Sequence, residues 1–157
     1  MTGILKVDQI QNNTGTTAMT INSDGYVNLP QAIAFMAQKT DAATHSAGGN
    51  IPFNSTITSH SGWNGTTFTC PVAGKYRFHM SAHMQSMSNS GYQIGIAKNG
   101  TVVIVAYAYN STATRERNSC EAILSCNVGD AITFRLIEGD VYAGGNSGVY
   151  CTGHLLG

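Results

Sequence analysis

The sequence is 157 residues long, which suits one domain with a short appendage, because single cores typically occupy about 100 to 200 residues. Charged residues make up only 10% of the chain, eight basic against eight acidic, so it lacks the basic surface that nucleic acids and anionic membranes select. Gly, Ser, Thr and Asn are abundant while strong helix formers are scarce, and this composition predicts an all-β fold.

Residues 1–31 differ in pattern from the rest of the chain. Short apolar pieces alternate with Asn- and Gly-rich turns at 12–15 and 22–25, and Pro30 ends the segment because proline removes a ladder donor. Such pieces bury no core of their own, since an isolated short hairpin is marginal in water. We therefore expect an extended anchoring or trimerisation arm whose apolar contacts come from Ile4, Leu5, Val7 and Ile10.

The N-terminus does not match a targeting signal. Lys6 and Asp8 interrupt its apolar residues, which a secretory signal does not tolerate, and no stretch reaches the roughly 18 apolar residues of a membrane span. We therefore expect synthesis in a cytoplasm and no membrane partner.

Residues 32–157 carry strand signals about every ten to twelve residues, the spacing of a sandwich or jelly roll. The clearest strand covers 75–80, where Tyr76 and Phe78 fall on one face and Arg77 and His79 on the other. Asn99 and Gly100 supply a two-residue hairpin turn. The alternation thus predicts a buried and an outward face for each strand.

Several motifs in this region resemble the C1q-like domain family, over about residues 32–157. The most specific is the run Phe68-Thr-Cys-Pro71-Val-Ala-Gly74-Lys-Tyr76-Arg-Phe78; the others are Ala34-Phe35, Ile51-Pro-Phe53-Asn54, Lys98-Asn-Gly100, Val128-Gly129-Asp130 and Gly153-His-Leu-Leu156. The resemblance implies a ten-stranded jelly roll of the C1q and tumour-necrosis-factor type that assembles as a homotrimer. It also implies a core signature of Phe35, Phe53, Phe68, Pro71, Gly74, Tyr76, Phe78, Gly129 and Gly153.

The resemblance, combined with strand alternation, predicts a trimer interface. In the resembled fold the strand at 75–80 lies beside the C-terminal strand, so the residues that face away from the core on both strands should share one surface. By the same alternation Arg135 should join them. The predicted interface residues are Arg77, His79, Arg135, Tyr150, Thr152 and His154.

The arm is similar to a different group, the virion structural proteins of marine and cyanobacterial phages. The similarity rests on Leu5-Lys-Val-Asp-Gln-Ile-Gln-Asn12 and Gly15-Thr-Thr17, and no collagen-like Gly-X-Y repeat is present. It implies a structural virion protein, a capsid decoration or tail-fibre component held through the arm by capsid or tail proteins. The alternative is a receptor-binding tip that recognises a host surface glycan or protein.

Candidate chemical sites are weak. His79 and His83 have metal-ligand spacing for a helix, but on a strand they lie about 13 Å apart. Residues 145–148, Gly-Asn-Ser-Gly, have the composition of an ordinary turn rather than of a catalytic serine loop. The carboxylates of Asp130, Glu138 and Asp140 do not have the spacing of a calcium-binding loop. We therefore expect no catalytic residue, no metal and no cofactor, and hence no enzyme.

Two further residue groups leave alternatives open. The four cysteines, Cys70, Cys120, Cys126 and Cys151, form no CxxC pair, so buried thiols are favoured over one disulfide. The aromatic residues near Gly- and Ser-rich turns could belong to the core and the interface or form a sugar-binding rim: Trp63, Tyr107, Tyr109 and Tyr142.

Overall fold

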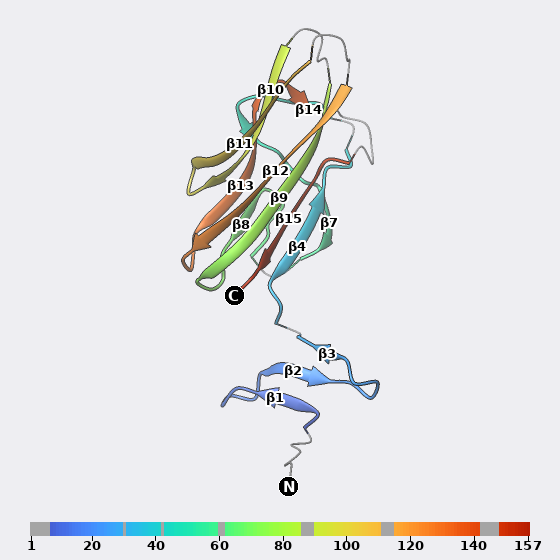
Figure 1. Cartoon of the computed structure of the whole chain (residues 1–157), viewed down its shortest axis with the longest axis vertical. Helices are drawn as coiled ribbons and strands as arrows, with labels where there is room; N and C mark the ends of the chain where they lie inside the picture. The colour runs from blue at the N-terminus through green and yellow to red at the C-terminus, as the bar shows by residue number, and fades with distance from the viewer. Residues whose placement is uncertain are drawn as a thin grey trace. The chain divides into compact units, whose positions relative to one another are not determined.

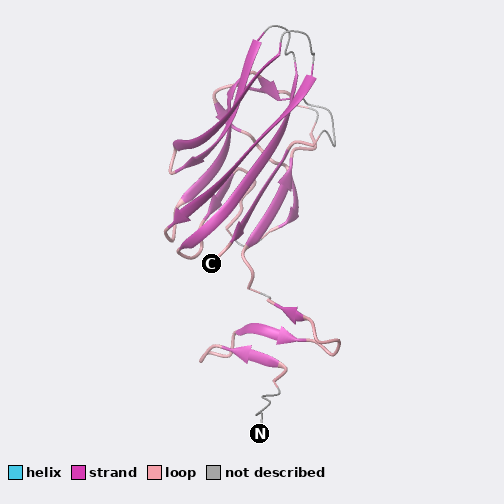
Figure 2. Ribbon diagram, viewed as in Figure 1, coloured by secondary structure: helices cyan, strands magenta, loops and turns pink. Residues whose placement is uncertain are grey.

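A computed structural model describes residues 7–29, 31–41, 43–59, 62–85, 90–110, 115–141 and 148–157. All regular structure among them is β, and none of them belongs to a helix that is long and apolar enough to cross a membrane. The chain divides into two compact units, Met1–Ile33 and Ala34–Gly157. Each unit is described by itself (Figures 1 and 2).

The N-terminal unit is a three-stranded antiparallel sheet in the order β1-β2-β3 (Figure 1). Its strands are β1 (Gln9–Gln11), β2 (Thr17–Ile21) and β3 (Val27–Asn28). The predicted turns separate them: the Asn12 side chain accepts hydrogen bonds from the backbone N–H groups of Thr14 and Thr16, and Gly15 takes a φ of 84°. These Asx contacts fix the turn with side chains rather than with a core.

The second unit is a jelly-roll sandwich of a seven-stranded and a five-stranded sheet. In the larger sheet the order is β5-β14-β9-β15-β4-β7, with β12 on β9; its members are β4 (Ala34–Gln38), β5 (His45–Ser46), β7 (Ser55–Thr58), β9 (Gly74–Gln85), β12 (Arg115–Cys126), β14 (Asp140–Val141) and β15 (Tyr150–Leu155). In the smaller sheet the order is β11-β10-β13-β6, with β8 also on β13; its members are β6 (Gly49–Asn50), β8 (Thr67–Thr69), β10 (Ser90–Lys98), β11 (Thr101–Asn110) and β13 (Ala131–Glu138).

The sandwich holds more strand segments than the ten that were expected. The difference comes from short pieces, because β5, β6 and β14 are two residues each. These pieces extend the sheets at the end of the sandwich where β14 pairs with the last residues of β9, Met84 and Gln85.

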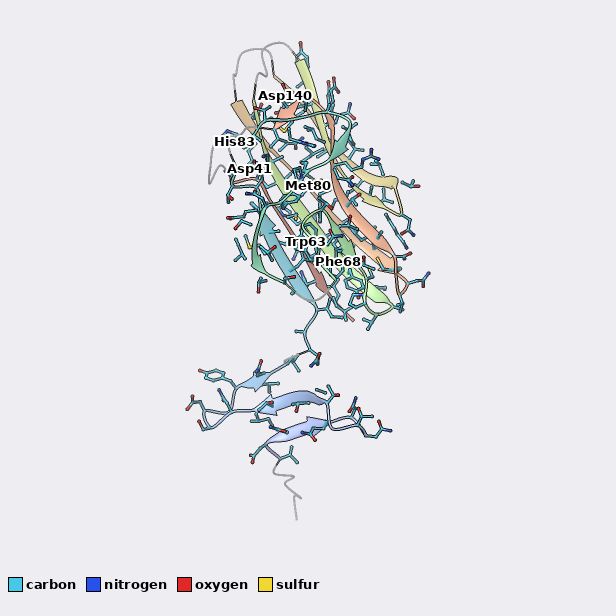
Figure 3. The ribbon with its side chains drawn as sticks, turned by 180° about the vertical axis from the view of Figure 1, so that it is seen from behind. Asp41, Trp63, Phe68, Met80, His83 and Asp140 are labelled. Carbon is cyan, nitrogen blue, oxygen red and sulfur yellow. The ribbon has the colours of Figure 1, made fainter. Side chains whose placement is uncertain are left out.

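Aromatic rings fill the space between the two sheets. Phe35 stacks on Trp63 and on Phe68, each with ring centroids 4.7 Å apart, and Tyr76 stacks on Phe78 at 5.8 Å. Figure 3 labels Trp63 and Phe68 together with Met80 of β9, which is also fully buried. The alternation read from residues 75–80 therefore predicts the correct buried face of β9.

The core signature is buried at some positions and not at others. Phe35, Phe53, Phe68, Tyr76, Phe78 and Gly153 are buried. Gly129 is not a core residue: it is exposed, has a φ of 85°, and donates its N–H to the Cys70 carbonyl in a turn. Pro71 and Gly74 are half-buried: Pro71 precedes β9 and Gly74 is the first residue of that strand.

Candidate assembly face

Four neighbouring strands of the larger sheet, β12, β9, β15 and β4, turn one common face away from the core. We call this surface the assembly face. Thr152 lies directly opposite His79 across the β9–β15 ladder, and His154 lies directly opposite Arg77. Tyr150 alternates with them on β15. The structure thus brings together Arg77, His79, Tyr150, Thr152 and His154, as alternation predicted.

Arg135 does not share this face. It lies on β13, which pairs with β10 in the smaller sheet, and its guanidinium donates to the Gly100 carbonyl at 3.5 Å. A sandwich has two outward faces, and Arg135 points from the other one. The prediction that Arg135 joins the interface residues is therefore wrong.

Charge on the assembly face is locally balanced. Arg77 donates to the Glu121 carboxylate at 2.6 Å, and both side chains are about half exposed. The hydrogen bond from Arg77 lowers the pKa of Glu121, and the same contact raises the pKa of Arg77. An exposed pair of this kind adds little stability, but the two charges balance each other within one chain.

His79 sits in the middle of this face beside Tyr150, with ring centroids 5.5 Å apart. Partial burial lowers the pKa of His79 most; Glu121 opposes that effect and Arg77 adds to it. The imidazole is therefore biased toward its neutral form.

Sequence reasoning missed the apolar part of the face. Ile123 on β12 is 60% exposed and lies directly opposite Arg77, and Met36 on β4 lies directly opposite Thr152. Alternation carries the signal, because Ile123 lies between Ala122 and Leu124, and if these two face inward Ile123 must point outward. An exposed isoleucine at this position suits contact with another chain.

The N-terminal sheet presents a second candidate surface, one that is apolar. Ile10 lies opposite Met19, and Ile21 lies opposite Val27, so all four side chains share one face of the sheet. Ile10 is 48% and Val27 56% exposed. Val7 is also exposed, while Ile4 and Leu5 lie outside the described residues.

No metal or catalytic cluster emerges from the part of the chain that the structure describes. It contains no group of three metal-ligating side chains, and His79 and His83 are four residues apart on one strand. Asp130 is structural: hydrogen bonds from Lys98, Asn99 and the Asn127 backbone lower its pKa to about 2. Glu138 accepts a hydrogen bond from Gln93, and Asp140 pairs with Ser46 and Gln85 in the ladder.

The aromatic candidates separate into buried and exposed residues. Trp63 belongs to the core, whereas Tyr107 and Tyr109 point outward from β11 and are more than half exposed. Tyr142 and residues 145–147 lie outside the described residues.

Comparison with known proteins agrees with this architecture. The globular domain of a zebrafish complement 1qA protein is similar at a TM-score of 0.64 and 16% identity, over 80% of this chain and 98% of that one. The Eiger TNF of S. frugiperda is similar at a TM-score of 0.62 and 11% identity, over 80% of this chain and 93% of that one. At such identities the likeness shows the fold. A family model, the C1q domain, matches residues 34–156, and the chain therefore belongs to the C1q domain family.

Proposed function

We propose that this chain is a trimeric structural protein of a phage virion. Its jelly roll would project from the particle as a capsid decoration or tail-fibre knob, and residues 1–31 would anchor it to a capsid or tail protein. The observation that carries the proposal is the N-terminal sheet, which is folded, amphipathic and separate from the jelly-roll core. Among the described residues of this unit no further strand or helix packs on the apolar face, and an exposed apolar face of this kind suits a partner surface.

The trimer is the assembly that the C1q resemblance implies, and the assembly face has suitable chemistry. Arg77 and Glu121 are paired within one chain, and Ile123 supplies exposed apolar area beside them. Bringing copies together at this point would bury Ile123 beside a charge pair that is already formed.

Light scattering of the full chain at micromolar concentration tests the trimer. We expect the mass of three chains, and Ile123→Asp should shift it toward the mass of one, because the contact would lose apolar area and would have to desolvate a carboxylate. Val128→Asp is the matched control, since Val128 is 69% exposed in a turn outside the assembly face. A monomeric wild-type protein would contradict the proposal.

Truncation tests the arm. Deleting residues 1–29 should leave a folded trimer that no longer enters particles, because the buried core residues of the described chain all lie at position 33 or later. A point variant sharpens the test: Val27→Asp, on the apolar face, should lower incorporation, whereas Asn28→Asp, on the opposite face, should not. Normal occupancy of the truncated protein would refute the anchoring role.

A second candidate function, recognition of a host surface glycan, is favoured by one feature of β11. The hydroxyl end of the Tyr107 ring lies over Gly91 of β10: a Cβ at Gly91 would come 2.9 Å from the Tyr107 Oη. Beside the ring, Gln93 faces Tyr107 in register and donates to the Glu138 carboxylate at 2.8 Å. An exposed aromatic ring next to an amide and a carboxylate suits the apolar face and hydroxyl groups of a neutral sugar.

A glycan array of host surface saccharides tests this role. We expect Tyr107→Ala to abolish binding and Gly91→Val to weaken it, because the added side chain displaces the ring. Tyr26→Ala is the control, since Tyr26 is 73% exposed in the N-terminal unit. Binding that survives Tyr107→Ala would exclude this site, and binding by neither protein would leave the structural role alone.

A further inference from the structure

Two of the four cysteines meet where the two sheets come together. Cys70 directly follows β8 of the smaller sheet, and Cys126 is the last residue of β12 in the larger one. The Cys70 N–H donates to the Asp130 carbonyl at 2.9 Å, and the Gly129 N–H donates to the Cys70 carbonyl at 2.9 Å, so the backbone holds Cys70 against the turn that follows Cys126. The two thiols are close enough for each to influence the pKa of the other, and the Cys126 thiol also donates to the Leu124 carbonyl at 3.8 Å.

Both thiols are buried, so they have little access to solvent, and each has the other as its nearest thiol. Cys70 has no exposed surface and Cys126 is 4% exposed. Tyr76, whose hydroxyl donates to the Val72 carbonyl, lies near both sulfur atoms. Within the described residues no third ligand completes a metal site here.

We propose that Cys70 and Cys126 are a dithiol pair that closes to a disulfide on two-electron oxidation and links the two sheets of the sandwich. A low-molecular-weight disulfide such as oxidised glutathione is a sufficient oxidant. One cysteine thiolate attacks it and releases one glutathione thiol; the second then attacks the mixed disulfide and releases the other. Two protein thiols are oxidised, one glutathione disulfide is reduced, and both protons end on the glutathione thiols.

The other two cysteines provide a built-in control. Cys120 and Cys151 both lie directly opposite Met80, but on the two different sides of β9. Two ladder spacings separate their backbones by about 10 Å, which exceeds the roughly 7 Å across which a disulfide forms without backbone movement. They should therefore remain thiols under the same conditions.

Burial makes the reaction slow in the folded protein. It raises the pKa of Cys70 to about 12 and also raises that of Cys126, so the attacking thiolate is scarce. Oxidation should therefore proceed during folding or through local opening of this end. Once formed, the bond closes a loop of roughly 55 residues, which restricts the unfolded chain and should raise the melting temperature by roughly 5 to 15 °C.

The full chain can be refolded from denaturant in buffers of reduced and oxidised glutathione, then alkylated and mapped by mass spectrometry. We expect the oxidised protein to lose the mass of two hydrogen atoms, to show one peptide pair joining Cys70 to Cys126, and to alkylate only at Cys120 and Cys151. Cys70→Ser and Cys126→Ser should each abolish the link and the melting-temperature increase. Cys120→Ser and Cys151→Ser should preserve both.

Three results would overturn the proposal. They are a refolded protein with four alkylated thiols in oxidising buffer, links spread among all four cysteines, and a linked protein that melts no higher than the reduced one. Because refolding exposes every thiol to the oxidant, a negative result cannot be attributed to poor access in the folded state.

Discussion

Gly153 occupies a position where a single methyl group should be costly. It lies on β15 directly opposite Phe35 on β4 and Phe78 on β9. A Cβ there would overlap Cε1 of Phe35 and lie 2.7 Å from Cδ1 of Phe78. Both rings are buried in the aromatic core, so neither can move toward solvent. Forcing extra atoms into a filled core typically costs about 1 to 3 kcal/mol, and we expect Gly153→Ala to lie near the upper limit.

The assay is thermal unfolding of the full chain at one fixed protein concentration, because dissociation of an oligomer makes the melting temperature depend on concentration. A loss of about 3 kcal/mol corresponds to a decrease of roughly 5 to 12 °C. Gly49→Ala is the control: its Cβ would lie 3.8 Å from the His45 ring, an ordinary contact, and should change the stability by less than about 1 kcal/mol. If Gly153→Ala melted within 2 °C of wild type, roughly the expected control effect, the close packing of β4, β15 and β9 would be refuted.

Further predictions concern the core and the turn after β12. Phe78→Ala should cost about 3 to 5 kcal/mol in a denaturant titration, and Tyr92→Ala a similar amount, because Tyr92 is fully buried on an interior strand rather than near a sheet edge; a loss below 1 kcal/mol for either would contradict the assigned core. Asp130 has a depressed pKa in the folded protein, so the stability it contributes is present above about pH 4 and is lost as the pH falls through about 2. Asp130→Asn should therefore reduce the loss of free energy of unfolding between pH 4 and pH 2. Asp24→Asn, in the N-terminal unit, should not reduce it.

The fold followed from the sequence because alternation and motif spacing report on burial directly. Tyr76 and Phe78 were assigned to the core from a period of two and Phe35 from the family motif, and their rings do meet there. A family motif does not by itself distinguish a buried residue from a turn glycine, and Gly129 of the signature is an exposed turn glycine with positive φ.

The residues of the assembly face could be predicted only in part from the sequence, because alternation does not say to which sheet a strand belongs. It separates inward from outward residues, yet a sandwich has two outward surfaces, and Arg135 was therefore placed on the wrong one. Contacts between residues far apart in the sequence could not be predicted either, because no local pattern indicates that Cys70 lies beside Cys126. Lys39 is nearly fully buried, and its ion pair with Asp41 depends on the local path of the chain after β4 rather than on any periodicity.

The assembly face should make stability sensitive to mild acid. Burial, together with Arg77 and against the influence of Glu121, lowers the pKa of His79 below its ordinary 6.5. A histidine with a depressed folded-state pKa binds fewer protons than in the unfolded chain, so its contribution is complete above about pH 6.5 and is lost as the pH falls through the folded-state value. His45, whose pKa burial and Lys39 also lower, acts in the same direction.

The melting temperature of the wild type should therefore decrease between pH 8 and pH 5. His79→Gln should make this decrease smaller, and a His79→Gln, His45→Gln double variant should make it smaller still. Thr152→Val is the control, since it lies opposite His79 and removes no titratable group. Adding His154→Gln to His79→Gln separates the two histidines of the assembly face, because His154 lies opposite Arg77 in the same ladder. If His79→Gln and wild type lost stability in parallel over the whole range, protonation of His79 would not be coupled to folding or assembly, and the acid sensitivity would have to arise elsewhere in the chain.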